Sequence, residues 1–260
     1  GSKAGDAATT TDDSTLIGYG AGGGAIMTGH DNVAVGSGAL SVATSGEANI
    51  IVGKDAGAAI TTGSSNTAIG HQALTANTTA SYNVAAGYQA ADATTTGTSN
   101  IAVGTGSLGG NTTGSNNTVV GTNASLVSTT AGQNTIIGRE AGKALTTGGV
   151  NTMVGDDAGK SATTGDKNTF IGQNAGYHVT TGAKNTILGR FDGNSHGFDM
   201  RASDYSTVIS NGDGELQGIF NGNGSMTLKL SRVTSDGYSY HPNIVAATED
   251  ISSLFTGGAG

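Results

Sequence analysis

The chain has 260 residues, including 46 Gly and no Cys or Trp, and only 12% of its residues are charged. Since Gly makes up about 7% of an average protein, this excess has a structural cause, and the composition differs from that of an ordinary globular enzyme. The net charge of -8 disfavours binding to nucleic acid or to an anionic membrane surface, and no apolar run is long enough to predict membrane insertion.

Residues 1–13 are small and polar and contain no apolar anchor. We expect them to form a flexible N-terminal arm, in which Gly1-Ser2 has the appearance of an expression-tag remnant. The apolar pattern begins at Ser14, and the folded part of the chain is expected to begin there.

A repeat of 17 residues fills the segment 14–190. Each unit reads Asn, three mostly apolar or Thr residues and Gly, followed by a variable stretch and Thr-Thr-Gly. Because so short a unit cannot bury a core alone, the repeat predicts an all-β parallel β-helix or β-roll, a rod about 48 Å long at about 4.8 Å per coil. One Asn marks each unit, and we expect these residues to form a structural ladder of stacked amides: Asn32, Asn49, Asn66, Asn83, Asn100, Asn117, Asn134, Asn151, Asn168 and Asn185.

The residues after each Asn predict a short strand that is apolar on both faces. The first and third, such as Val33 and Val35, share one face, while the residue between them, such as Ala34, points the opposite way. In an isolated solenoid this middle column would meet water, yet it is never polar, which predicts that further copies of the chain cover it in a homotrimer. The column grows to Met153 and Phe170, so the shared core is expected to thicken toward the carboxyl end. The alternative is a wide monomeric coil that buries both faces itself.

Two other columns are regular. The Gly that follows each Asn by four residues predicts a corner where a Cβ does not fit. The Thr pairs, for example Thr61-Thr62, are predicted to have a structural role in a strand, where one residue of each pair is exposed. An exposed Thr column leaves an ice-binding solenoid as an alternative, and ligand binding is the alternative for the Asn column.

No residue pattern predicts a catalytic site, a metal site or a cofactor. The five His residues are dispersed, but acidic residues follow the Gly column at Asp55, Glu140, Asp156 and Asp157. A polysaccharide depolymerase needs two such carboxylates, and this enzyme class stays an alternative. Because Arg139 lies among them without an aromatic stripe, we interpret them as a solvated charged edge and expect no enzyme.

After Arg190 the composition changes, and residues 191–260 predict an antiparallel β-rich tip module. Alternating residues over 198–202 and 226–230 predict strands, and the Asn-Gly-rich segments 211–214 and 221–224 predict hairpin turns. Asp213-Gly214-Glu215 is interpreted as part of such a turn and not as a calcium loop. Seven of the twelve aromatic residues lie in this module, and Tyr205, Tyr238 and Tyr240 are candidates for stacking on a glycan, with packing in the tip core as the alternative.

Units such as Asn66-Thr67-Ala68-Ile69-Gly70 resemble the head repeats of trimeric autotransporter adhesins, which are trimers of left-handed parallel β-rolls. The segment 198–214 resembles the part of bacteriophage tail fibres and tailspikes that often precedes a self-cleaving chaperone. Together these resemblances imply a homotrimeric tail fibre or tailspike of a virion that attaches to a glycan or protein receptor on the host cell surface. A trimeric adhesin head on a bacterial cell surface is the alternative.

Overall fold

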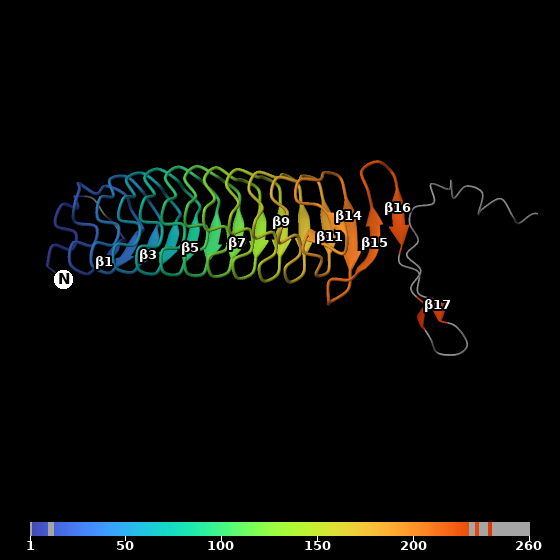
Figure 1. The fold of residues 1–260 in the computed structure, drawn as a ribbon. Coiled ribbons are helices and arrows are strands. Elements are labelled where there is room, and N and C mark those ends of the chain that lie inside the picture. The colour runs from blue at the N-terminus through green and yellow to red at the C-terminus, as the bar shows by residue number, and fades with distance from the viewer. Residues whose placement is uncertain (1, 10–12, 229–231, 234–238, 241–260) are drawn as a thin grey trace, which may run out of the picture.

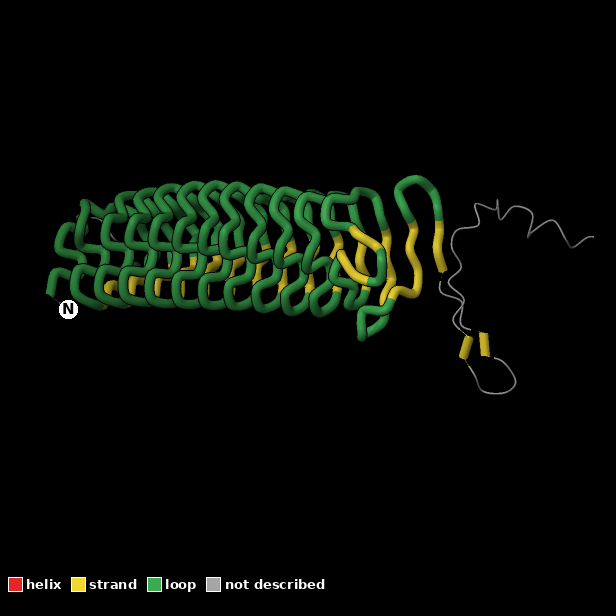
Figure 2. The backbone as a smooth tube through the Cα atoms, viewed as in Figure 1, coloured by secondary structure: helices red, strands yellow, loops and turns green. Residues whose placement is uncertain are grey.

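The computed structural model describes residues 2–9, 13–228, 232–233 and 239–240. Most of these residues form a β-solenoid, in which the chain advances by one coil about every 17 residues (Figure 1). Each coil is numbered here after the strand with which it begins. The strands line one side of the rod, and most of each coil is loop (Figure 2). The described residues contain no helix long and apolar enough to cross a membrane.

Eleven strands of three residues each stack in parallel along the rod. The register is constant: Val33 pairs with Ile50, Ala34 with Ile51 and Val35 with Val52, and the same three positions pair in the next coils. The predicted all-β parallel solenoid is therefore confirmed. The strands are β1 Thr15–Ile17, β2 Val33–Val35, β3 Ile50–Val52, β4 Thr67–Ile69, β5 Val84–Ala86, β6 Ile101–Val103, β7 Thr118–Val120, β8 Thr135–Ile137, β9 Thr152–Val154, β10 Thr169–Ile171 and β11 Thr186–Leu188.

The middle residue of each strand points into the coil, which is opposite to the predicted direction. The residues of this column from β2 to β11 are completely buried within the single chain, whereas the first and third residues of each strand face outward and are partly exposed. The expectation that a second chain covers the middle column was wrong. Both columns are apolar, so the pattern alone did not distinguish the inner column from the outer one.

Most coils balance the size of their own core. The residue six positions after the middle of the strand lies opposite it, and a large strand residue is paired there with Gly. A Cβ added to Gly176 would lie 2.8 Å from Phe170 Cδ2, and one added to Gly159 would lie 2.6 Å from Met153 Sδ. Where the strand residue is Ala, the opposite residue is a buried Leu in three coils, as in the pair Ala34 and Leu40. The predicted thickening of a shared core is therefore wrong, because Gly compensates for Met153 and Phe170 within the same coil. The pairs in coils 2 to 10 are Ala34/Leu40, Ile51/Gly57, Ala68/Leu74, Ala85/Ala91, Ala102/Leu108, Val119/Ser125, Ile136/Gly142, Met153/Gly159 and Phe170/Gly176.

The ladder Asn residues, one in each repeat, are buried. They are hydrogen-bonded from one coil to the next. Asn49 donates from its backbone N–H and its side-chain amide to Oδ1 of Asn32, at 3.0 and 3.1 Å, and donates a further bond to the carbonyl of Gly63 at 3.0 Å. Ser206 continues the column, since its backbone N–H donates to Asn185 Oδ1 at 2.9 Å. This arrangement uses the hydrogen-bonding capacity of the amides in an interior that water does not reach.

Two corners of the coil require unusual backbone conformations. The Gly that follows each strand has φ between 105° and 142°, and a Cβ on Gly138 would lie 2.1 Å from the carbonyl oxygen of Gly155 in the next coil. The residue before each Asn has φ near +60° although it is never Gly, as in Val150 at 60°. Left-handed backbone is strained for a β-branched residue such as Val150.

The Thr pairs lie in a bend and not in the predicted strand. The hydroxyl of the first Thr donates to the next coil, for example from Thr61 to the carbonyl of Thr78 at 3.0 Å. The second Thr, such as Thr62, is exposed. The first column is therefore occupied by contacts between coils, and the second column is a row of free hydroxyls.

The carboxyl-terminal strands extend the same sheet. The strand β14 Thr207–Ser210 pairs with β11 in parallel, and β15 Leu216–Phe220 and β16 Met226–Leu228 follow in antiparallel order. The predicted turns connect them, with Gly214 N–H donating to the Asn211 carbonyl at 3.1 Å. Of the strand predicted over 198–202, only β13 Phe198–Asp199 forms, paired with β12 Asn194–Ser195. The remaining described strands are β17 Arg232–Val233 and β18 Ser239–Tyr240, which pair with each other.

The amino-terminal residues 2–9, within the segment expected to be a flexible arm, make backbone contacts with coil 1. Gly5 N–H donates to the Ala21 carbonyl at 2.9 Å, and Ala8 forms a parallel bridge with Met27.

Candidate functional site

The outward face of the sheet is an unbroken stripe of β-branched and aliphatic side chains. The exposed fraction is 46% for Ile50, 48% for Ile69 and 41% for Ile171. Twelve parallel strands at about 4.8 Å, each three residues or about 10 Å wide, give the face an area of about 500 Å². The third outward residue is aliphatic in all twelve strands, whereas the first is Thr in eight of them, so about half of this area is a continuous apolar column. Contiguous apolar surface commonly marks an interaction site.

The second feature is the pair of residues that follows each corner Gly, which we call the variable corner. This corner flanks the outward sheet face, and its residues change from coil to coil. In coils 3 to 10 the pairs are Lys54-Asp55, His71-Gln72, Tyr88-Gln89, Thr105-Gly106, Thr122-Asn123, Arg139-Glu140, Asp156-Asp157 and Gln173-Asn174. Residues at this corner can differ without changing the Asn and Gly columns, so a specific ligand could be distinguished here.

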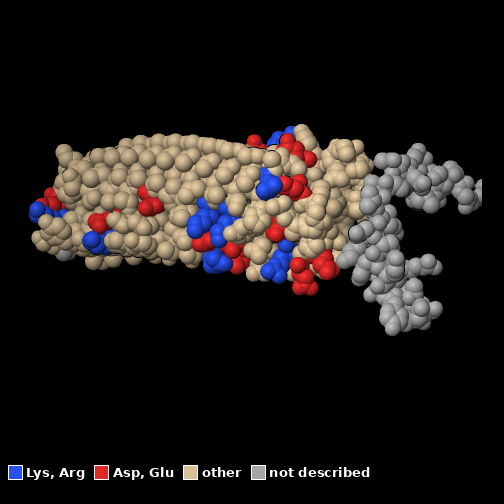
Figure 3. Space-filling model, viewed as in Figure 1, with Lys and Arg blue, Asp and Glu red and all other residues tan. Residues whose placement is uncertain are grey.

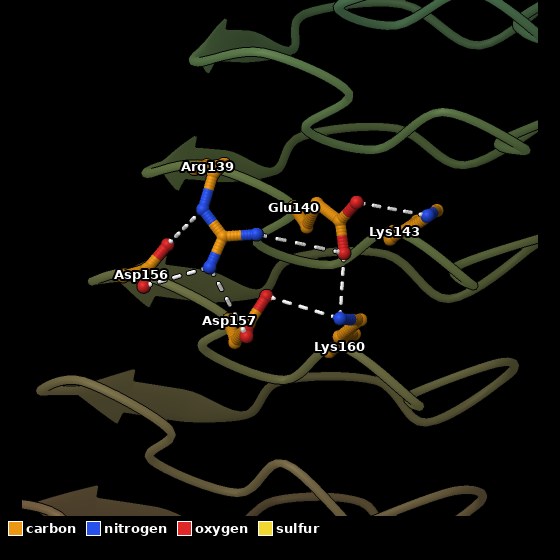
Figure 4. Close-up of polar contacts among 6 residues, drawn as sticks. All are labelled: Arg139, Glu140, Lys143, Asp156, Asp157 and Lys160. Carbon is orange, nitrogen blue, oxygen red and sulfur yellow. Dashed lines mark hydrogen bonds and ion pairs between the residues drawn. The ribbon is translucent and has the colours of Figure 1, made fainter.

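In coils 8 and 9 the variable corner carries a network of ion pairs (Figure 4). Arg139 binds both carboxylate oxygens of Asp156, each at 2.9 Å, and approaches Asp157 at 3.5 Å. Lys160 contacts Glu140 and lies 3.3 Å from Asp157. The network ties adjacent coils together, and its cations and carboxylates neutralise one another.

The network also lowers the pKa of one of its carboxylates. Hydrogen bonds from the ammonium groups of Lys160 and then Lys143 lower the pKa of Glu140 from 4.5 to about 2. A glycosidase acid needs a raised pKa in order to hold a proton near neutral pH, so Glu140 is unsuited to that role. The interpretation of these residues as a charged edge agrees with the geometry of the network.

Coils 4 and 5 present two aromatic rings and two amides at the same corner. The rings of His71 and Tyr88 stack with a centroid distance of 5.5 Å and an interplanar angle of 12°. Beside them, Gln89 Nε2 donates to Gln72 Oε1 at 3.2 Å. From residue 56 to residue 138 the only charged residue is Asp92, and on the face drawn in Figure 3 charged side chains gather mainly over the carboxyl-terminal coils.

The candidate glycan-stacking residues of the sequence are distributed differently. Tyr205 is 58% exposed, its ring lies 4.4 Å from Lys184 Nζ, and its hydroxyl accepts a hydrogen bond from the same ammonium. Tyr240 belongs to β18, and Tyr238 lies outside the described residues. The Asn column is buried, so its side chains are not accessible to a ligand.

No group of three or more His, Asp or Glu side chains within the described ranges could hold a metal ion. Asp213 and Glu215 lie in a turn in which Asn211 Oδ1 accepts hydrogen bonds from both backbone N–H groups, at 3.0 and 2.9 Å. The turn interpretation of this segment therefore accounts for its geometry.

Comparisons with protein-family models, with curated proteins and with solved structures found no match. The sheet face and the variable corner are therefore the features of the molecule that bear on its function. Sequence reasoning did not identify the contact between His71 and Tyr88, although both follow a corner Gly and are 17 residues apart. Comparing residues one repeat apart would have revealed this pair.

Proposed function

We propose that the chain is the shaft of a homotrimeric attachment fibre, in which three copies turn their outward sheet faces toward a common axis. The observation that supports this proposal is the outward face of β1 to β11 and β14, whose third residue is aliphatic in every strand along the whole solenoid. Covering this face removes its β-branched side chains from water and stabilises the assembly. The contacts between chains then come from the outer strand columns, not from the middle column.

The resemblance to phage tail fibres favours attachment of a virion to a host cell surface, and a bacterial trimeric adhesin is the alternative. A long stack of coils holds its tip far from its base, which suits either use. The function is structural and receptor-binding, and we propose no enzymatic activity.

The test is the mass in solution. A trimer has three times the 25.3 kDa mass of one chain, and static light scattering distinguishes the two. The variant Ile137→Asp places a charge on the outward face, where the native side chain is 39% exposed, and is expected to yield folded monomers. Thr113→Asp, in the exposed Thr column, is the control and should remain trimeric. A native mass of one chain for the wild-type protein would refute the proposed assembly.

Attachment is tested separately by incubating the labelled protein with host cells and measuring the amount that sediments with them. Binding that is saturable and competed by unlabelled protein is expected. A trimer that binds no cell of the tested panel would leave a purely structural rod.

One observation favours ice binding as a second candidate. Six consecutive strands of the sheet, β7 to β11 and β14, carry Thr at the first outward position and an aliphatic residue at the third. A flat and regular array of this kind can contact ice only if no other chain covers the face. A monomeric protein that shows thermal hysteresis would favour this candidate over the fibre.

A further inference from the structure

The variable corner changes size abruptly between coils 5 and 6. Coil 4 presents His71 and Gln72 and coil 5 presents Tyr88 and Gln89, whereas coil 6 has only Thr105 and Gly106 at these places. Because His71 stacks on one face of the Tyr88 ring, the other face is turned toward the shorter residues of coil 6. Tyr88 is 49% exposed, in agreement with an open ring face.

Hydrogen-bonding groups lie beside this ring. The side chains of Gln72 and Gln89 make a single hydrogen bond with each other among the described residues. An amide side chain offers two donors and an acceptor, so the amide N–H₂ of Gln72 and the carbonyl of Gln89 remain available to a ligand. In coils 8 and 9, by contrast, Arg139 at the equivalent place already pairs with Asp156 and Asp157, and Glu140 pairs with Lys143 and Lys160.

The charge of the surroundings limits the class of ligand. Apart from Asp92, no charged residue occurs between positions 56 and 138, a segment that includes the whole of coils 4 to 7. The nearest ammonium group is that of Lys54 in coil 3, which already pairs with Asp55 at 3.4 Å, and coils 4 to 7 contain no Lys or Arg with which an acidic glycan could pair its carboxylates. An uncharged ligand with an apolar ring face and many hydroxyls matches an aromatic face flanked by amides.

We propose that Tyr88, Gln72 and Gln89 form a binding site for a neutral glycan, with one sugar ring stacked on the Tyr88 face that is turned toward coil 6. The two amides bind the sugar hydroxyls, and His71 holds the Tyr88 ring in place. The site lies on the shaft and not on the tip, and it flanks the sheet face that faces the trimer axis. The inference rests on the proposed function, because attachment to a cell surface supplies the glycan.

The repeat itself provides the variants for a test. Tyr88→Thr introduces the residue that coils 6 and 7 have at the same place, so the coil is expected to fold. Tyr82→Ser is the matched control, because Tyr82 is 67% exposed in the same part of the rod and the equivalent residues of the neighbouring coils are Ser65 and Ser99. Tyr88→Phe retains the ring and removes only the hydroxyl.

Binding of the purified protein is measured against maltohexaose, chitohexaose and mannohexaose, with oligogalacturonate as the acidic comparison. We expect binding to at least one neutral oligosaccharide, weakened about tenfold or more by Tyr88→Thr, since one aromatic stacking contact supports a factor of this order. Tyr88→Phe and Tyr82→Ser should bind as the wild type does. Gln72→Leu should also weaken binding, because it removes the free donors.

Three results would overturn the inference: no binding to any neutral oligosaccharide of the panel, stronger binding to oligogalacturonate, or equal losses in Tyr88→Thr and Tyr82→Ser. Cell sedimentation separates this inference from the proposed function. If folded Tyr88→Thr attaches to cells as well as the wild type does, the shaft site is wrong and the fibre proposal stands. If the wild type binds the oligosaccharide but no cells, the site stands and the attachment function fails.

Discussion

The pairing of core sizes within each coil makes a quantitative prediction for Met153 and Gly159. Both residues are fully buried or nearly so, and Ala162 is the third core residue of their coil. The double change Met153→Ala with Gly159→Leu converts the coil to the combination Ala, Leu, Ala that coil 2 has at Ala34, Leu40 and Ala43. The two substitutions should therefore compensate for each other.

The magnitudes follow from the contacts. Met153→Ala alone leaves a cavity and should cost about 3 kcal/mol of unfolding free energy. Gly159→Leu alone places a Cβ 2.6 Å from Met153 Sδ and 3.0 Å from Phe170 Cδ2. Overpacking and the left-handed backbone should together cost about 3 kcal/mol or more. Leu is tolerated at this place in coil 2, where Leu40 has φ of 52°.

If the two side chains occupy one shared volume, the double variant should lose only about 2 to 3 kcal/mol, which gives a coupling energy of about 3 kcal/mol. Denaturant unfolding gives the overall stability of each variant, and native-state hydrogen exchange of the amides in coil 9 gives the local value, which matters because a stack of repeats can open in parts. A double variant whose loss equals the sum of the single losses would refute the size-pairing argument.

Three further predictions concern the backbone and the ion pairs. Gly138→Ala should lower stability by about 4 kcal/mol or prevent folding, because the added Cβ would meet the Gly155 carbonyl at 2.1 Å; the thermal midpoint measures the loss, and an unchanged midpoint would contradict the corner geometry. Val150→Asn should raise stability by about 1 kcal/mol, because Asn tolerates the left-handed backbone that strains Val; a lower midpoint would indicate that Val150 makes a packing contact that outweighs the strain. Glu140→Gln should lower the unfolding midpoint at neutral pH. Because the pKa of Glu140 is lowered from 4.5 to about 2 in the folded chain, the ionised carboxylate stabilises the fold above pH 4.5, and this stabilisation disappears as the pH falls toward about 2. The midpoints of the wild type and this variant should therefore converge in acid, and a constant difference down to pH 2 would contradict the assignment.

The period of the repeat was sufficient to predict the coils and their parallel stacking, and the Asn-Gly-rich sequences predicted the turns near Asn211 and Asn221. The direction in which the strand residues point was not predicted, since both columns of a strand such as Val33–Val35 are apolar. The residue six positions further along indicates which column points inward, because Leu40 follows the small Ala34 and Gly57 follows the large Ile51. When one of two positions becomes larger as the other becomes smaller, the two side chains occupy one shared volume. This relation joins a strand residue to a residue outside the strand, so the alternation of residues within the strand does not reveal it.

The candidate site was partly predictable for a related reason. The exposed edge of Glu140, Asp156 and Asp157 follows from charge, because ionised groups are costly to bury. The stacking of His71 on Tyr88 depends on which residues of different coils become neighbours. Residues 17 positions apart lie next to each other in adjacent coils, so the length of the repeat identifies this pair.

The balance of core sizes within each coil also bears on how such rods vary in length. A large strand residue such as Phe170 is compensated inside its own coil by Gly176, although the cores of adjacent coils also touch, since a Cβ on Gly159 would lie 3.0 Å from Phe170 Cδ2. The Asn and Gly columns present the same bonding groups at every junction. Units of 17 residues whose core residues match those of their neighbours are therefore interchangeable. Gene duplication or deletion of one unit changes the reach of the rod by about 4.8 Å and creates no new junction chemistry. Reach and recognition can then evolve separately, the first through the number of coils and the second through the two residues that follow each corner Gly.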